Sequence, residues 1–113
     1  MTPEVHHLDP VEGKRRVDAG ALLLDVRNPN EWQSGHADGA AWIPMSELAE
    51  RQEELPTDRD IVVICKTGAR SARVAAALVA AGYGAVNVAG GCEAWQAAGF
   101  PIVTDGGQPG TVA

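Results

Sequence analysis

The chain has 113 residues, of which 45% are hydrophobic, so it is long and apolar enough for one domain and cannot be a wholly disordered protein. Its formal net charge of −6 argues against nucleic acid or an anionic membrane as the main partner, because both attract basic surfaces. The N-terminus lacks a basic segment followed by an apolar run, and no apolar stretch is long enough to span a bilayer. We therefore expect a cytoplasmic protein whose two cysteines serve chemistry or packing rather than a structural disulfide.

The sequence predicts alternating helices and strands, with a polar residue, Gly or Pro at nearly every boundary. The predicted elements are, in order, a helix between Asp9 and Gly20, a strand at 21–26, a helix start at 28–31, a strand at 41–43, a helix at 46–54, a strand at 61–64, a helix at 71–81, a strand at 85–89, a helix at 93–98 and an edge strand at 102–103. Such an alternation predicts an α/β fold with a mainly parallel central sheet and helices on both faces. Residues 104–113 have little to bury, so we expect a domain over residues 1–103 followed by a flexible, disordered tail.

The most informative segment is the connection that carries Cys65 from a predicted strand to a predicted helix. In open parallel sheets ligands bind at the carboxyl ends of strands, and Cys65 lies at such an end. The connection can curl so that its backbone N–H groups surround an anion, with the helix N-terminus behind them. We predict that Cys65 is the catalytic nucleophile and that the binding loop consists of Lys66, Thr67, Gly68, Ala69, Arg70 and Ser71.

Ionising this thiol requires several contributions. A cysteine with an ordinary pKa of about 8.5 is only about 3% thiolate at pH 7, and its pKa must fall by about two units for the thiolate to dominate. A helix N-terminus supplies less than that, so the loop N–H groups and the charges of Lys66 and Arg70 are expected to supply the rest. Packing is the alternative role, because free cysteines are among the most buried residues. The basic, polar loop is a poor core segment, which favours chemistry.

Other reactive side chains have simpler interpretations. Cys92 has no basic neighbour close in sequence and is expected to be structural, with a role as a resolving thiol as the alternative. His36 is expected to be a hydrogen-bonded loop histidine, because an ionised thiol needs no general base. His6 and His7 are adjacent and cannot chelate one metal from a strand. We expect neither a metal nor a cofactor.

Three charged residues near the strand at 21–26 are expected to be architectural. Arg27 and Glu31 are spaced to pair across the turn that opens the short helix. Asp25 ends the strand, where its carboxylate can accept hydrogen bonds from neighbouring backbone N–H groups.

Five motifs occur in order along the chain: Leu24-Asp25-Val26-Arg27 with Glu31-Trp32, Gly35-His36 with Gly39-Ala40 and Ile43-Pro44, the Cys65 loop, Gly90-Gly91 with Ala94-Trp95, and Gly99-Phe100-Pro101. With these motifs the chain resembles the single-domain rhodaneses, the thiosulfate sulfurtransferases, from about Val5 to Val103. The resemblance implies a rhodanese-like fold in which Asp25, Arg27 and Glu31 support the active-site side. It also implies ping-pong sulfur transfer, in which a Cys65 persulfide takes sulfane sulfur from thiosulfate or another persulfide donor. The implied acceptor is cyanide, a cellular thiol or a sulfur-carrier protein.

Two other functions stay open on the sequence. Cysteine phosphatases and arsenate reductases also place a thiolate in an anion-binding loop before a helix. Cys65 and Arg70 enclose four residues, whereas the phosphatase loop encloses five, and one residue fewer shortens the chain by up to about 3.5 Å. The smaller ring suits a single sulfur atom better than a tetrahedral oxyanion. The other alternative is a non-catalytic binding domain, and the intact basic loop argues against it.

Overall fold

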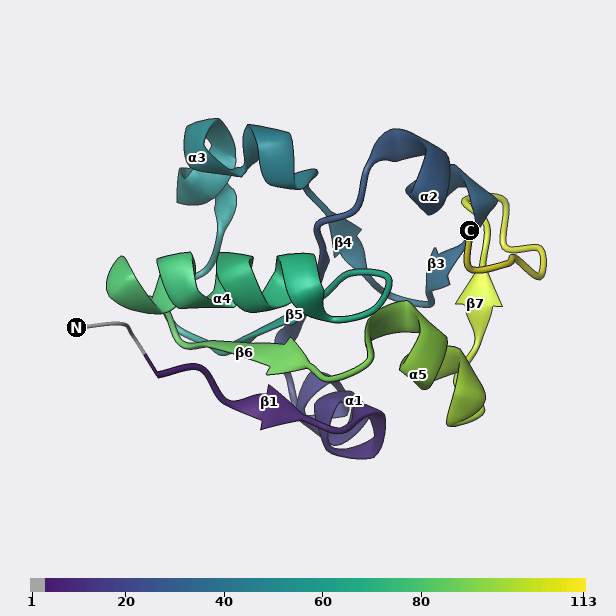
Figure 1. Cartoon of the computed structure of the whole chain (residues 1–113), viewed down its shortest axis with the longest axis horizontal. Coiled ribbons are helices and arrows are strands. Elements are labelled where there is room, and N and C mark those ends of the chain that lie inside the picture. The colour runs from purple at the N-terminus through teal and green to yellow at the C-terminus, as the bar shows by residue number, and fades with distance from the viewer. Residues whose placement is uncertain (1–3) are drawn as a thin grey trace.

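The computed structural model describes residues 4–113, which form a central sheet with helices on both faces (Figure 1). The elements are β1 (His7–Leu8), α1 (Pro10–Asp18), β2 (Leu22–Asp25), α2 (Pro29–Ser34), β3 (His36–Ala37), β4 (Ala41–Trp42), the 3-10 helix η1 (Met45–Glu47), α3 (Leu48–Arg51), the 3-10 helix η2 (Gln52–Glu54), β5 (Ile61–Ile64), α4 (Ala69–Ala80), β6 (Ala85–Val88), α5 (Gly91–Ala97) and β7 (Ile102–Val103). Five strands form a sheet in the order β1-β6-β5-β2-β4, and each neighbouring pair is parallel. The separate pair β3-β7 is antiparallel. The predicted α/β fold with a mainly parallel sheet is confirmed.

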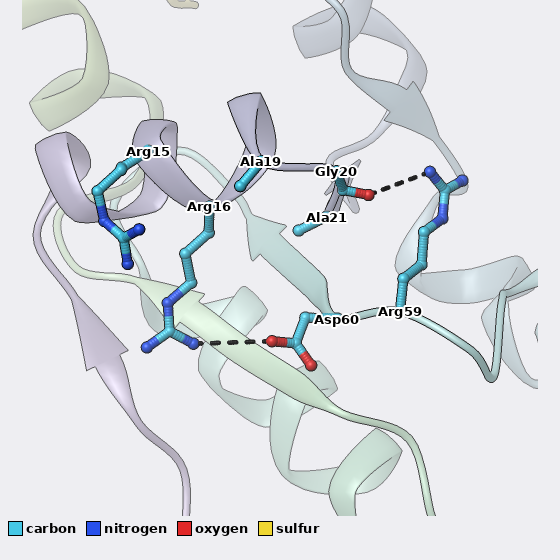
Figure 2. A pocket seen from close by; sticks show the side chains of 7 residues that line it. All are labelled: Arg15, Arg16, Ala19, Gly20, Ala21, Arg59 and Asp60. Carbon is cyan, nitrogen blue, oxygen red and sulfur yellow. Dashed lines mark hydrogen bonds and ion pairs between the residues drawn. The ribbon is translucent and has the colours of Figure 1, made fainter.

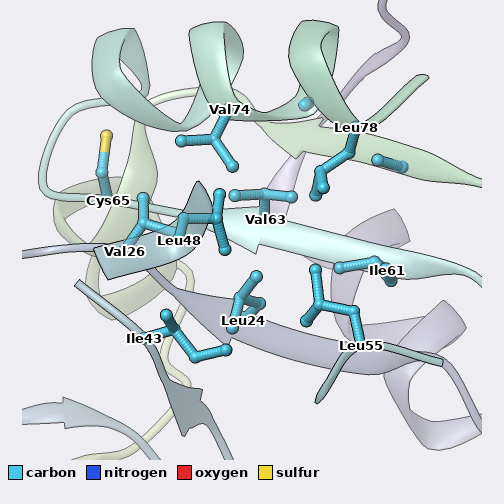
Figure 3. Close-up of a cluster of buried hydrophobic side chains, with 12 residues drawn as sticks. Leu24, Val26, Ile43, Leu48, Leu55, Ile61, Val63, Cys65, Val74 and Leu78 are labelled. Carbon is cyan, nitrogen blue, oxygen red and sulfur yellow. The ribbon is translucent and has the colours of Figure 1, made fainter. Parts of the chain in front are cut away.

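The central strand β5 shows how the sheet separates two apolar layers. Its side chains alternate, so that Ile61 and Val63 pack in the layer beneath α3 and α4, which Figure 3 shows. Val62 and Ile64 pack in the opposite layer, with side chains of α1 and α5. All four side chains are completely buried, as expected of a strand covered on both faces. This alternation decides on which face each functional side chain of the sheet lies.

Several boundaries differ from the predicted ones for local reasons. The helix expected from Ser46 is broken into η1, α3 and η2, and Pro44, which offers no capping side chain, precedes the first piece. Helix α4 begins at Ala69 rather than Ser71, because Gly68 takes a left-handed conformation, with φ of 103°, and starts the helix. Strands β1 and β3, of two residues each, were not predicted, and each contains a histidine rather than two apolar residues. None of the helices described over residues 4–113 has the length and apolar content of a membrane span.

Residues 104–113 run back along the β3-β7 pair and α2. The N–H of Gly110 donates to the carbonyl of Ile102 at 2.8 Å, and the N–H of Thr111 donates to the carbonyl of Ser34 at 2.9 Å. The carboxylate of Asp105 accepts from the indole N–H of Trp32 at 3.1 Å. Composition alone did not indicate these contacts, and the flexibility of this segment stays a prediction.

Candidate active site

Cys65 follows β5 directly and lies on the face of the sheet that α4 covers. It lies two positions after Val63, and both side chains belong to the layer beneath α3 and α4. Figure 3 shows the sulfur pointing from the sheet toward the loop that leads into α4. Cys65 is 0% exposed, whereas Thr67 and Ala69 on the rim of the loop are exposed. The loop therefore encloses the sulfur and presents its own rim to solvent.

Hydrogen-bond donors of the loop converge on this sulfur. The N–H of Gly68 donates to Sγ at 3.1 Å, and the hydroxyl of Ser71 lies 3.2 Å from the same atom. Burial raises the pKa of the Cys65 thiol, but the Ser71 hydroxyl and the backbone N–H groups of Ser71, Gly68 and Thr67 lower it more, so the pKa lies below its usual value. The geometry therefore favours the thiolate.

The first turn of α5 holds the loop from outside. The N–H of Cys92 donates to the carbonyl of Cys65 at 2.7 Å, and the N–H of Glu93 donates to the carbonyl of Lys66 at 3.1 Å. This approach requires glycine at position 91, because a Cβ there would lie 2.4 Å from the Cys65 carbonyl oxygen, and the backbone has φ of 59°. With these carbonyls bound by α5, the N–H groups of the loop are left to face the sulfur.

Arg70 is paired rather than free. Its guanidinium donates to both carboxylate oxygens of Glu31, at 2.7 and 2.9 Å, so that α4 is joined to α2. The ion pair holds the pKa of the Glu31 carboxyl below its usual value. Lys66 is half-buried and forms no ion pair with any residue in the described part of the chain. Glu31 thus neutralises part of the Arg70 charge, whereas no carboxylate in the described part of the chain pairs with Lys66.

The predicted pairing of Arg27 with Glu31 is wrong. Arg27 instead binds Asp25 through contacts of 2.8 to 3.0 Å, and both side chains are completely buried. The spacing of four residues suits a pair on one helix, but Arg27 precedes the cap residue Asn28 and so lies outside α2. The expected backbone contact of Asp25 is confirmed, since its carboxylate accepts from the N–H of Arg27 at 2.9 Å.

The remaining candidates lie apart from the sulfur donors. Cys92 is completely buried in the opposite layer, and burial raises the pKa of its thiol to about 12. His36 is buried, stacks on Trp32 and places Nδ1 3.0 Å from the carbonyl of that tryptophan. Both environments are those of structural side chains.

Two of the hollows on the surface lie at opposite ends of the sheet, and one of these two adjoins the loop. The first, of about 230 Å³, is lined by Val26, Asn28, Pro44, Met45, Ser46 and Arg70. The second, of about 350 Å³, lies at the start of β2 and β5, the opposite end of the sheet (Figure 2). Its arginines are engaged within the chain, since Arg16 lies 3.9 Å from Asp60 and Arg59 donates to the carbonyl of Gly20. Of these two hollows, the smaller one borders the Cys65 loop, through Arg70.

Sequence reasoning missed Asn87, which approaches the loop from β6. Its side chain contacts both Ser71 and Gly68, and it also meets His7 of β1. A signal was present, because Asn87 is the one polar residue of an otherwise apolar strand. A polar side chain in a buried strand needs partners, and these were not identifiable from the sequence.

The parallel sheet and the loop at its carboxyl end define an α/β protein with a buried thiol among hydrogen-bond donors. The Rhodanese-like domain family model matches residues 9–98, and the chain belongs to this family. It is 44% identical to a sulfurtransferase of Allochromatium vinosum, over 76% of this chain and 81% of that protein. It is 36% identical to thiosulfate sulfurtransferase 18 of Arabidopsis thaliana, over 94% of this chain and 89% of that protein. A rhodanese-related protein of Thermoplasma volcanium superposes with a TM-score of 0.82 at 33% identity, over 88% of this chain and 99% of that structure.

Proposed function

We propose that this protein is a sulfurtransferase that carries sulfane sulfur on Cys65 as a persulfide. The observation that carries the proposal is the convergence of the Gly68 N–H and the Ser71 hydroxyl on the Cys65 sulfur. Sulfurtransferase relatives support the reaction class, and the name of the Arabidopsis thaliana relative supports thiosulfate as the donor. The site residues are the predicted ones, Cys65 with Lys66, Thr67, Gly68, Ala69, Arg70 and Ser71, and Asp25, Arg27 and Glu31 support them.

The reaction proceeds in two balanced halves. The Cys65 thiolate attacks the outer sulfur of thiosulfate, a new S–S bond forms, and sulfite leaves with the electron pair of the broken bond. The terminal sulfur of the persulfide then lies within the ring of N–H groups. An acceptor, either cyanide or a thiolate, attacks that terminal sulfur, and Cys65 leaves as the thiolate with which the cycle began.

Charge selects the donor. Thiosulfate is a small dianion, and the N-terminal end of α4 together with Lys66 offers it positive potential beside the hollow at Arg70. Glu31 neutralises part of the Arg70 charge, so we assign Lys66 the larger share in attracting the donor. The acceptor is a cellular thiol, cyanide or a sulfur-carrier protein in the cytoplasm. Nucleic acid and membranes are not expected partners of a chain with a net charge of −6.

The phosphatase alternative is less well supported. A phosphoryl group needs donors arranged around a tetrahedral oxyanion, whereas here the donors meet the sulfur itself at 3.1 and 3.2 Å. A non-catalytic binding domain would have no need of a cysteine whose pKa is lowered. The binding domain would leave the polarised sulfur unused, and the loop of four residues between Cys65 and Arg70 is one residue shorter than that of the phosphatases.

Intact mass measured under non-reducing conditions tests the proposal. Incubation with thiosulfate should add one sulfur atom to the protein, and cyanide or a thiol should remove it. Cys65→Ser should gain nothing, and Cys92→Ala should gain the atom like the unmodified protein. Absence of any gain with thiosulfate and with a low-molecular-weight persulfide would reject sulfur transfer, and hydrolysis of phosphoesters would then support the phosphatase.

A further inference from the structure

A buried asparagine connects the Cys65 loop to the edge of the sheet. Asn87 lies within β6, is 2% exposed and pairs in register with Val63 on one side and His7 on the other. Its neighbours Val86 and Val88 belong to the layer beneath α1 and α5. The alternation of the strand therefore directs the Asn87 side chain to the opposite face, which is the face of Cys65.

Both polar atoms of the Asn87 amide are engaged. The oxygen Oδ1 accepts from the Ser71 hydroxyl at 2.6 Å. The nitrogen Nδ2 donates to the carbonyl of Gly68 at 3.3 Å and lies 3.0 Å from Nδ1 of His7. With the amide oriented in this way, Nδ1 of His7 is the acceptor, and neutral His7 carries its proton on Nε2. A rotated amide would place Oδ1 against the Gly68 carbonyl, which can only accept, so this contact fixes the orientation of Asn87.

The two groups that Asn87 holds are also the two groups that meet the Cys65 sulfur. Gly68 donates to Sγ through its N–H, and Ser71 reaches Sγ through its hydroxyl. The hydroxyl has one proton and two acceptors, Oδ1 of Asn87 and Sγ of Cys65. A thiolate is the stronger acceptor, whereas an uncharged sulfur leaves the proton to Asn87.

We propose that Asn87 is a positioning residue for the nucleophile: through Ser71 and Gly68 it holds both sulfur donors, and it accepts the Ser71 proton whenever Cys65 is not a thiolate. Asn87 touches neither the sulfur nor a substrate, so its effect passes through these two residues. Without it, the Gly68 carbonyl loses a partner and the Ser71 hydroxyl loses its fixed orientation. Loss of Asn87 frees the Ser71 proton for the sulfur but releases both donors from their positions, and we expect the second effect to prevail, so that the thiolate is less well stabilised. The inference rests on the proposed function only for its turnover measurement, because thiol ionisation can be measured without a sulfur donor.

The pH dependence of Cys65 alkylation by iodoacetamide, with the modified residue identified by peptide mass, tests this role. In Asn87→Ala the midpoint should move upward by about one pH unit, which makes alkylation about tenfold slower at pH values below both midpoints. The matched control is Val86→Ala, which also removes a buried side chain from β6 but in the opposite layer. The charged and titratable groups around the site are the same in both variants, namely Lys66, Arg70, Glu31, Asp25, Arg27, Cys92 and His7. An unmoved midpoint in folded Asn87→Ala, or an equal shift in Val86→Ala, would overturn the proposal.

Coupling to Ser71 separates positioning from a general loss of stability. If Asn87 acts through Ser71, the double variant Ser71→Ala/Asn87→Ala should shift the midpoint by less than the sum of the two single shifts. Turnover with thiosulfate should lose kcat in Asn87→Ala with little change in KM, since Asn87 itself touches neither the sulfur nor the donor. Additive shifts would reject the role. A shifted midpoint in a protein that never accepts sulfur would reject the proposed function while leaving the positioning role intact.

A measurement on unmodified Asn87 avoids any question of folding. The side-chain amide resonances of Asn87 should titrate with the Cys65 midpoint, because the Ser71 proton moves between Oδ1 and Sγ. Recording the titration in His7→Phe removes the contribution of the neighbouring imidazole, and Cys65→Ser should abolish it. Amide resonances that stay constant through thiol ionisation would contradict the proposal.

Discussion

Cys65 and Cys92 are both completely buried, yet their surroundings favour opposite charge states. Burial raises the pKa of each thiol, and for Cys92 it prevails and brings the pKa to about 12. At Cys65 the Ser71 hydroxyl and the backbone N–H groups outweigh burial, and the pKa lies below its usual value. Burial therefore does not separate a reactive cysteine from a structural one in this protein. The two thiols differ instead in the hydrogen-bond donors that are directed at the Cys65 sulfur.

The two cysteines are nevertheless connected through the backbone. The N–H of Cys92 donates to the carbonyl of Cys65 at 2.7 Å, so α5 supports the loop irrespective of the side chain at position 92. The Cys92 side chain itself packs in the layer that contains Trp95 and Ile102. Position 92 thus contributes to the site by its main chain and to the core by its sulfur.

The largest expected effect comes from replacing each cysteine separately. Cys65→Ser should reduce sulfur transfer to background, because the hydroxyl is not ionised at neutral pH and cannot form a persulfide. Cys92→Ala keeps the supporting N–H and should retain activity within about threefold, with a loss of stability of about 1–2 kcal/mol from the cavity. Initial rates and urea unfolding of both variants check this. A folded but inactive Cys92→Ala would show that the second thiol takes part in the reaction.

A smaller but still large effect should follow when the contact between the first turn of α5 and the Cys65 loop is disrupted. Gly91→Ala puts a methyl group 2.4 Å from the Cys65 carbonyl oxygen, and the backbone there has φ of 59°. We expect a loss of about 2–3 kcal/mol in the free energy of unfolding and at least about tenfold slower transfer. Thermal unfolding and kcat/KM report the two effects separately.

Gly82 provides the matched control for this substitution. It also has positive φ, at 95°, but a Cβ there meets nothing within 4 Å. Gly82→Ala should therefore lose only about 1 kcal/mol, the cost of the left-handed backbone, and should keep full activity. Equal losses of activity in the two variants would mean that the close approach at Gly91 has no special importance for the loop.

The comparison of the two cysteines also shows what could be read from the sequence. The Cys65 loop was predicted because its signal is local: an apolar strand, a cysteine, a short basic loop and a helix follow one another in the chain. The sheet was predicted for a similar reason, since residues 61–64 are apolar throughout. The Ser71–Asn87 and Asn87–His7 contacts join residues 16 and 80 positions apart, and they depend on strand order and register, which one sequence does not reveal.

Charge pairing was the least predictable part of the site. Spacing suggested that Arg27 binds Glu31, but each of these residues has a different partner in the folded chain. Arg27 lies two residues after Asp25 and turns with it into the core, whereas Glu31 faces α4 from the first turn of α2. Arg27 pairs with a residue two positions away and Glu31 with one 39 positions away, so tertiary packing rather than the four-residue spacing decided the pairs.

The smallest expected effect separates charge from hydrogen bonding at the nucleophile. Glu31→Gln removes the negative partner of Arg70 but leaves both sulfur donors of Cys65 in place. The freed guanidinium should attract the dianionic donor, so KM for thiosulfate should fall by about two- to threefold. Glu54→Gln, which breaks an exposed pair with Arg51, is the control and should leave KM unchanged. A raised KM would show instead that Glu31 holds Arg70 in the orientation that binds the donor.

Glu31→Gln should also change the free energy of unfolding in a way that depends on pH. Arg70 depresses the pKa of the Glu31 carboxyl in the folded protein, so its contribution to stability is present above the unfolded value of about 4.3. That contribution is lost as the pH falls through the depressed pKa, because the protonated acid no longer pairs with the guanidinium. At neutral pH, Glu31→Gln should therefore be less stable than the unmodified protein by about 1 kcal/mol, and in acid the two should converge. Urea unfolding at both pH values measures the difference, and a gap that persists in acid would mean that Glu31 acts by packing rather than by charge.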